Sequence, residues 1–461
     1  MCYHGGCGPG TGLITMDTPI CDFVREYSGK NALRLHVPGH KGHSFLGMED
    51  LDITEIHGAD SLYEASGIIA RSEANASRLF GCKTLYSTEG SSQCIRAMLY
   101  LVQLYAGKNG KKVRIAAGRN AHKTFLTAAA LLDLEVDWLY PKDNSGYLSC
   151  DLNAEDISAY LEKATDQPAA VYLTSPDYLG NLVDIASIAA VCHQNGVLLA
   201  VDNAHGAYLK FLSRSMHPMD LGADLCCDSA HKTLPVLTGG AYLHISEKFP
   251  EDIAVQAKNA MAIFGSTSPS YLILQSLDQA NMYLDTYKEK LTAFLEQVHA
   301  LKKALQENGY SLSGNEPLKI NIAAKLYGYS GTALAEILIR QGLVPEFFDS
   351  DYLVLMLTPE TGREGLERLE TVLKQIPRKK MLEDHVPALR PAVQVMSIRE
   401  AMLSCSEVVT VAESLGRILA VPTVGCPPAV PIVACGERID SHAIDCFDYY
   451  GIKDCCVVKE N

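Results

Sequence analysis

The stretch DSAHKTLP at residues 228–235 is the strongest indication of how this chain folds and of the chemistry it carries. In this stretch Lys232 directly follows His231, and Ser229 lies three positions before it. Upstream, an apolar run ends in VDNAH at residues 201–205, so Asp202 lies at the end of an expected strand. A lysine amine can form a Schiff base with pyridoxal 5′-phosphate (PLP), and an acid can keep the pyridinium nitrogen of that cofactor protonated. The two stretches therefore predict a PLP-dependent enzyme.

Short apolar segments alternate with helical periods around these two stretches. The segments bounded by turn residues are expected to be buried strands, at 113–117, 170–174, 197–202 and 240–244. Between residues 94 and 105 apolar side chains recur at helical spacing. This alternation predicts an α/β fold with a mostly parallel central sheet and helices on both faces. Active residues should then gather where the strands end.

The chain after the lysine stretch predicts two further parts. A long helix is expected to begin near Tyr283 and to end at the Asn-Gly pair 308–309. Strand, helix and strand are then expected at 318–323, 332–340 and 351–357, which indicates a smaller α/β domain. The predicted division is a flexible N-terminal segment at 1–20, a large PLP-binding domain at 21–285, the small domain at 286–378, and a C-terminal module at 379–461 that begins next to a basic linker, 378–380.

Composition narrows the possible partners. The 461 residues are 48% hydrophobic and 20% charged, as in ordinary globular proteins. A net charge of −14 argues against nucleic acid or an anionic membrane as partner. The charge is compatible with a cationic substrate, and equally with a solvated acidic surface. No apolar run approaches the roughly 20 residues that span a bilayer. No secretory signal is visible, and 15 scattered cysteines suggest reduced thiols, so a cytoplasmic protein is expected.

The cysteines give little sign of a metal site. Cys2, His4 and Cys7 are close in sequence, but a structural zinc site needs four ligands and no second cluster follows nearby. No bound metal is therefore predicted. Cys226 and Cys227 lie in an apolar run and are expected to be buried structural residues.

A turn at Gly90, Ser91 and Ser92 precedes the helical period that begins at residue 94. Such a turn at a helix start presents free backbone N–H groups and two hydroxyls to an anion, and the helix dipole adds to the attraction. The cofactor phosphate is the natural ligand. Serine-rich turns are also ordinary helix N-caps, so this prediction depends on its combination with Asp202 and Lys232.

Five further residues are candidates for the same site. His122 follows an expected strand, and its flat ring can stack on a pyridine ring, although alone it could equally be a surface loop histidine. Ala204 can support the opposite face of that ring, and His205 can reach the substrate or the phenolic oxygen of the cofactor. Ser229 and His231, beside the lysine, can both donate to the phosphate.

Taken together, these features resemble the prokaryotic ornithine/lysine/arginine decarboxylase family, a branch of the PLP fold type I (aspartate aminotransferase-like) enzymes. The resemblance covers most of the chain and preserves the order of the motifs. One departure is that Thr238 is followed by Gly239, where the family usually has glutamine. The other stretches of this chain that resemble the family are HVPGHKG at 36–42, DITEI at 52–56, LTSPDY at 173–178, TSPSY at 267–271, CPPAVP at 426–431 and Gly-Glu at 436–437.

The resemblance implies roles for individual residues. Lys232 would carry the Schiff base and Asp202 would be the pyridinium partner, with His122 and His205 also catalytic. Thr267 and Ser268 match a segment that lies close to the cofactor of the neighbouring subunit in such dimers, which implies a homodimer or a larger homo-oligomer. The implied cofactor-binding residues are Gly90, Ser91, Ser92, His122, Asp202, Ala204, Ser229, His231, Lys232, Thr267 and Ser268.

The implied reaction is the PLP-dependent decarboxylation of arginine, lysine or ornithine. Two alternatives remain open: transamination, for which Arg340 or Arg363 would have to hold the substrate carboxylate, and a non-catalytic member of the family that serves as a binding subunit. The sequence does not identify the substrate. The acids that could meet a cationic side chain are Glu55, Asp60, Glu64, Glu346 and Asp349.

Overall fold

The computed structural model describes residues 16–107, 112–141, 146–383, 387–422 and 429–460. Cys2, His4 and Cys7, most of the expected flexible segment 1–20, and the CPP of the landmark at 426–431 lie outside these ranges. Within them, no helix combines the length and the apolar character needed to cross a bilayer.

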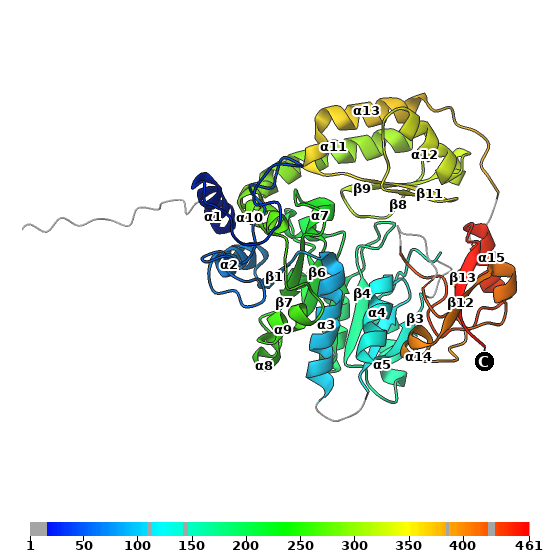
Figure 1. Ribbon diagram of the computed structural model, residues 1–461. Coiled ribbons are helices and arrows are strands. Elements are labelled where there is room, and N and C mark those ends of the chain that lie inside the picture. The colour runs from blue at the N-terminus through cyan, green and yellow to red at the C-terminus, as the bar shows by residue number, and fades with distance from the viewer. Residues whose placement is uncertain (1–15, 108–111, 142–145, 384–386, 423–428, 461) are drawn as a thin grey trace, which may run out of the picture.

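A seven-stranded sheet forms the large part of the molecule, with strand order β1-β7-β6-β5-β4-β2-β3 (Figure 1). Its central and β3-side strands are parallel, and only β7 runs antiparallel, to β1 and β6. The predicted mostly parallel sheet is therefore confirmed. The strands are β1 (Lys83–Ser87), β2 (Arg114–Gly118), β3 (Glu135–Leu139), β4 (Ala170–Thr174), β5 (Leu198–Asp202), β6 (Leu225–Asp228) and β7 (Ala241–Ile245).

Helices cover both faces of this sheet, as predicted. On β4, Val171 and Leu173 pack with residues of α5 and α6, whereas Ala170 and Tyr172 pack with residues of α3 and α4. The helices of this part are α1 (Pro19–Gly29), α2 (Ile68–Phe80), α3 (Gly90–Ala106), α4 (Lys123–Leu132), α5 (Ala154–Lys163), α6 (Ile185–Gln194), α7 (Ala230–Thr233), α8 (Glu251–Ala254), α9 (Ala257–Ile263) and α10 (Tyr271–Asp285).

A four-stranded antiparallel sheet, in the order β10-β11-β9-β8, lies beside α11, α12 and α13 (Figure 1). The structure differs here from the predicted long helix, because Thr286, a β-branched residue with φ −115° and ψ 8°, separates α10 from α11. The elements are α11 (Tyr287–Glu307), α12 (Gly331–Arg340), α13 (Gly362–Gln375), β8 (Leu312–Ser313), β9 (Lys319–Ala323), β10 (Phe347–Phe348) and β11 (Tyr352–Met356).

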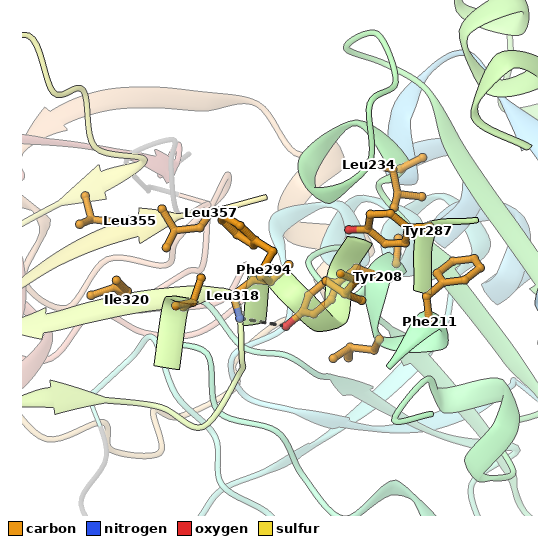
Figure 2. Packing of buried hydrophobic residues seen from close by; sticks show 14 of the residues in the cluster. Tyr208, Phe211, Leu234, Tyr287, Phe294, Leu318, Ile320, Leu355 and Leu357 are labelled. Carbon is orange, nitrogen blue, oxygen red and sulfur yellow. Dashed lines mark hydrogen bonds between the residues drawn. The ribbon is translucent and has the colours of Figure 1, made fainter. Parts of the chain in front are cut away.

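One continuous apolar cluster joins the two sheets. Figure 2 shows Tyr208 of the large part next to Leu318 of the small one, within a cluster that also contains Tyr287 and Leu357. The Tyr208 hydroxyl also lies 3.3 Å from the backbone nitrogen of Leu318, which donates a hydrogen bond to it. The small sheet is therefore held in a fixed position above the ends of the large-sheet strands.

The C-terminal part contains α14 (Ile398–Leu403), α15 (Ser441–Tyr449), and the strand pair β12 (Ser406–Thr410) and β13 (Asp454–Val458). Arg119, which is 1% exposed and follows β2, attaches it to the large part. The guanidinium of Arg119 donates to the carbonyls of Pro431 and Ile432 and to the carboxylate of Glu437. The described residues thus contain three sheets, and the division into domains at 20, 285 and 378 remains our proposal.

Candidate active site

A cavity of about 340 Å³ lies where the parallel strands of the large sheet end. Ten of the site residues predicted from the sequence line it: Gly90, Ser91, Ser92, His122, Asp202, Ala204, His205, Ser229, His231 and Lys232. Both other parts of the chain contribute, since Glu346 precedes β10 and Ala429 and Val430 belong to the C-terminal part. Residues that sequence reasoning did not assign also line it: Ile95, Asn120, Leu148, Thr174, Pro176 and Tyr178.

The N-terminus of α3 opens into this cavity. Gly90 adopts φ +72°, and its N–H donates to the carbonyl of Gly239. No side chain caps α3 in the described part of the chain, so the next backbone N–H groups are available to an anion. The Ser229 hydroxyl donates to Ser91 Oγ at 2.8 Å, which joins the lysine turn to this helix start.

Gly239, the departure from the family pattern, contributes directly to this turn. It has φ +98°, a conformation that favours glycine, and a Cβ at this position would lie 3.0 Å from the carbonyl oxygen of Thr88. The glycine therefore permits the close approach that forms the Gly90–Gly239 hydrogen bond.

Asp202 ends β5 and is 2% exposed. Its carboxylate accepts hydrogen bonds from the Tyr172 hydroxyl at 3.2 Å and from the backbone N–H of Ala204 at 3.2 Å. Burial raises the pKa of Asp202 above its ordinary value, and Lys232 together with these hydrogen bonds offsets that only partly. A cation that reaches this carboxylate would therefore be bound favourably.

Lys232 belongs to the short helix α7 and lines the same cavity. Burial lowers the pKa of its amine, the nearby Asp202 opposes that effect, and Lys319 adds to it. A lowered pKa increases the share of neutral amine, which is the nucleophilic form needed for Schiff-base formation.

His122 is the N-cap of α4. Its Nδ1 accepts from the backbone N–H of Thr124 at 3.1 Å and lies 2.9 Å from the hydroxyl of the same residue. Burial, with Lys232 second, lowers the pKa of His122 to about 4, so the ring is neutral near pH 7. The ring is therefore fixed and uncharged, which suits stacking on an aromatic cofactor.

His205 has a neighbour that the sequence did not reveal. Lys319, on β9 of the small sheet, lies with its Nζ 2.9 Å from His205 Nδ1. Burial lowers the pKa of His205 well below its ordinary value, and Lys232 and Lys319 lower it further. The two residues are 114 positions apart in sequence, and no local pattern predicts their contact.

Other sequence candidates do not reach the cavity. Thr267 and Ser268 are exposed between α9 and α10 and are not among its lining residues. Of the five acids considered, only Glu346 lines it, and the Tyr178 hydroxyl donates to this carboxylate at 3.2 Å. Asp60 instead accepts backbone N–H groups around the start of α2. The remaining acids, Glu55, Glu64 and Asp349, do not line the cavity either.

Asp228, at the end of β6, is the centre of a second buried cluster that the sequence did not reveal. Its Oδ2 lies 3.0 Å from His217 Nε2 and 3.1 Å from His244 Nε2, and its Oδ1 accepts from the amide of Asn203 at 2.6 Å. The two histidines and the aspartate are also close enough together to hold a metal ion. Hydrogen bonds from both rings to one carboxylate account for the arrangement, and Cys226 and Cys227 beside it are buried as expected.

The comparison with protein families decides what kind of protein this is. The model of the Orn/Lys/Arg decarboxylase major domain matches residues 18–327. The chain belongs to the Orn/Lys/Arg decarboxylase family. It is 29% identical to the uncharacterized protein YaaO of Bacillus subtilis (strain 168), over 93% of each chain. It is 26% identical to an arginine decarboxylase of the same organism, over 93% of this chain and 92% of the relative.

Solved structures show the same fold. The lysine decarboxylase of Francisella novicida superposes with a TM-score of 0.77 at 17% identity, over 97% of this chain and 82% of that one. The constitutive lysine decarboxylase of E. coli gives a TM-score of 0.75 at 17% identity, over 96% of this chain and 82% of that one. The protein is thus a decarboxylase with the PLP fold type I architecture.

This membership implies PLP as the cofactor, and the cavity fits it. The uncapped start of α3 with Ser91 suits the phosphate, and the incompletely compensated carboxylate of Asp202 suits the pyridinium nitrogen. Lys232 lines the same cavity and would supply the amine. When bound, PLP supplies an electron sink for the pair of electrons left by the departing carbon dioxide.

Proposed function

We propose that the protein decarboxylates a basic amino acid, arginine, lysine or ornithine, to the corresponding amine and carbon dioxide through a Schiff base at Lys232. The observation that carries this proposal is the single cavity that Lys232, Asp202, His122 and Ser91 all line. In this proposal Asp202 keeps the pyridinium protonated, His122 stacks on the ring, and Ser91 with its neighbours holds the phosphate. Lys232 or a histidine returns a proton to Cα.

Glu346 supports the choice of a basic substrate. It is exposed to solvent and also lines the cavity, so it lies at the mouth, where the Tyr178 hydroxyl orients its carboxylate. A carboxylate in this position can pair with a guanidinium or ammonium group at the end of a long side chain. The arginine decarboxylases among the relatives agree with a substrate of this class.

Transamination receives less support. Such an enzyme must hold the α-carboxylate of its substrate, and Arg340 and Arg363 were the candidates. Both are exposed and neither lines the cavity in the described part of the chain. Arg363 instead pairs with Glu367 on the surface of α13.

A substrate panel tests the proposal. The purified enzyme, loaded with PLP, is given arginine, lysine, ornithine and neutral amino acids, and the amine products are identified by mass. We expect one basic amino acid to be converted, and Glu346→Gln to raise KM for it more than tenfold while Glu64→Gln, at an exposed acid outside the cavity, leaves KM unchanged. Conversion of only neutral amino acids, or formation of an α-keto acid, would overturn the proposal.

Borohydride reduction followed by peptide mapping tests the Schiff base directly. The pyridoxyl label should lie on Lys232, and it should be absent from the Lys232→Ala protein. A label on another lysine would contradict the assignment.

We also propose that the working unit is at least a homodimer. Several large apolar side chains after α1 are exposed, among them Leu33 at 83%, Leu35 at 85%, Phe45 at 78% and Leu46 at 82%. Exposed large apolar side chains gathered in one segment favour contact with another protein surface, and the exposed loop at Thr267 is available to a neighbouring site. Mixing inactive Lys232→Ala with an inactive Thr267→Ala/Ser268→Ala variant should restore activity if sites are shared. A fully active monomer in solution would refute the dimer.

A further inference from the structure

Lys319 is a buried lysine on the small sheet, and its side chain reaches His205 in the active-site cavity. Its side chain is 1% exposed. Its Nζ lies 2.9 Å from His205 Nδ1 and donates hydrogen bonds to the carbonyls of Asp177 at 3.2 Å and Tyr178 at 3.4 Å. One of these three groups within hydrogen-bonding distance is therefore a ring nitrogen at the cavity wall.

Glu316 compensates the charge of this lysine. Its Oε2 lies 3.2 Å from Lys319 Nζ, and its Oε1 accepts from the Tyr208 hydroxyl at 2.7 Å. Two carbonyl oxygens and a carboxylate oxygen thus surround Nζ, and none of them can donate a hydrogen bond. This geometry suits an ammonium that acts only as a donor.

The contact determines where the proton of His205 resides. Lysine ammonium has no acceptor, so the ring nitrogen that faces it must be unprotonated. The single proton of the neutral imidazole is then on Nε2. No hydrogen bond to Nε2 is found among the described residues, and His205 lines the cavity, so this N–H remains for a bound molecule.

We propose that Lys319 is a positioning residue that holds His205 as the Nε2–H tautomer, so that His205 offers a hydrogen-bond donor to the cavity in which Lys232 lies. The ring is also kept neutral, because burial and the surrounding basic groups Lys232, Lys319, His122 and His231 all lower the pKa of His205. The edge of the Tyr178 ring, with centroids 5.2 Å apart, fixes the imidazole orientation.

The use of this donor rests on the proposed function. A negatively charged oxygen is the acceptor that such an N–H would meet there, either the phenolic oxygen of the cofactor or the carboxylate of the amino acid. Because Lys319 belongs to β9, the tautomer also depends on the docking of the small sheet. The Tyr208–Leu318 hydrogen bond and the apolar cluster around it maintain that docking (Figure 2).

The tautomer can be read without any catalysis. Histidine-selective ¹⁵N labelling of the cofactor-free protein, with the His205 signals assigned by their loss in His205→Gln, reports which ring nitrogen carries the proton. We expect wild-type His205 to show an unprotonated Nδ1 and a protonated Nε2 near neutral pH. A protonated Nδ1 in the wild type would overturn the proposal at once.

A matched pair of variants tests the role of the lysine. Lys319→Met combined with Glu316→Gln removes both buried charges together and so avoids leaving an unpaired carboxylate. In this variant the Nε2–H preference should be lost, with both nitrogens showing partial protonation. Lys302→Met is the control, because Lys302 lines one pocket together with Lys319 but, within the described residues, donates to the carbonyls of Glu316 and Pro317 and not to His205.

The control should keep the wild-type signals of His205. Unchanged signals in the double variant would overturn the proposal, as would an equal change in the Lys302→Met control. If the substrate panel instead showed no decarboxylation, these spectra would be unaffected, so failure of the proposed function and failure of this inference are distinguishable.

Discussion

Asp202 and Asp228 end neighbouring parallel strands, yet their surroundings shift their pKa values in opposite directions. Asp202 is opposite Cys227 in the register of β5 and β6, so Asp228 is one residue further along. Both are buried. Burial raises the pKa of Asp202, whose hydrogen-bond donors are neutral groups. At Asp228 burial acts in the same direction, but His217 and His244 outweigh it and the pKa lies below its ordinary value.

The difference separates a binding carboxylate from a structural one. Asp228 is surrounded by His217, His244 and the Asn203 amide, so its charge is compensated within the protein. Asp202 lines the cavity and lacks an equivalent set of partners. A carboxylate whose charge the protein leaves partly uncompensated is suited to a cation that arrives with a ligand, which in the proposed function is the pyridinium of the cofactor.

The largest expected effect is the loss of turnover in Asp202→Asn. An amide cannot keep the pyridinium protonated, so the electron sink weakens while the α3 turn still binds the phosphate. We expect kcat to fall about a thousandfold or more, or roughly 4 kcal/mol in the barrier, since each ~1.4 kcal/mol is tenfold. Steady-state kinetics give the rate, and absorbance of bound PLP shows that the variant is loaded. A loaded variant with a near-native rate would contradict the role of Asp202.

The same substitution at Asp228 should act on stability instead. Asp228→Asn removes the charge that two buried imidazoles share, and breaking a buried ion pair costs about 3–5 kcal/mol. Urea unfolding should show a loss of this size in the free energy of unfolding. Asp220→Asn is the control, because its pair with Lys210 is partly exposed and should contribute less than about 1 kcal/mol. Equal losses in the two variants would remove the distinction between the clusters.

Much of the site could be predicted because it is local in sequence. Lys232, Ser229 and His231 share one turn, and Asp202 ends a strand that its apolar run predicts. The carboxyl ends of parallel strands lie along one edge of the sheet, so residues from separate motifs were expected to meet there. In the structure these residues line one cavity.

The missed features depend on contacts between distant segments. Asp228 lies in the most informative stretch, but its partners come from η3 (Pro218–Leu221), where His217 is the N-cap, and from β7. Strand β3 was not predicted because it carries charges, which its neighbour β2 compensates through the pairs of Arg114 with Glu135 and Asp137. The sequence around Lys319 does not indicate its role, because its contact with His205 forms only when the small sheet packs against the large part.

In the cofactor-free protein, Asp202→Asn should change the free energy of unfolding in the opposite direction to Asp228→Asn and by a smaller amount. The folded-state pKa of Asp202 is raised, so the folded chain is destabilised by this carboxyl at pH values above its ordinary pKa of 3.8. Removing the charge should increase the free energy of unfolding near neutral pH by on the order of 1 kcal/mol. Urea unfolding of the two apoproteins measures it. A loss comparable with that of Asp228→Asn would show that Asp202 is compensated within the protein after all.

The smallest expected effect is a pH dependence carried by His244. Burial opposes its charge, but Asp228 outweighs burial and raises the pKa of His244 above its ordinary value of 6.5. A raised folded-state pKa means that the stabilisation is fully present below the unfolded-state pKa and is lost as pH rises through the folded-state pKa. The stability difference between wild type and His244→Gln should therefore be greatest below about pH 6 and decrease at alkaline pH, by about 1.4 kcal/mol for each unit of pKa difference.

The control for this prediction is the same substitution in an Asp228→Asn background. Besides Asp228, the groups that face His244 are Phe80, Cys82, Thr84, Tyr242 and His217. Because Asp228 is the largest cause of the raised pKa of His244, most of the pH dependence should disappear once Asp228 is neutral. Persistence of the dependence without the Asp228 charge would mean that the raised pKa comes from another neighbour, and the Asp228 cluster would then differ from Asp202 in hydrogen bonding alone rather than in charge compensation.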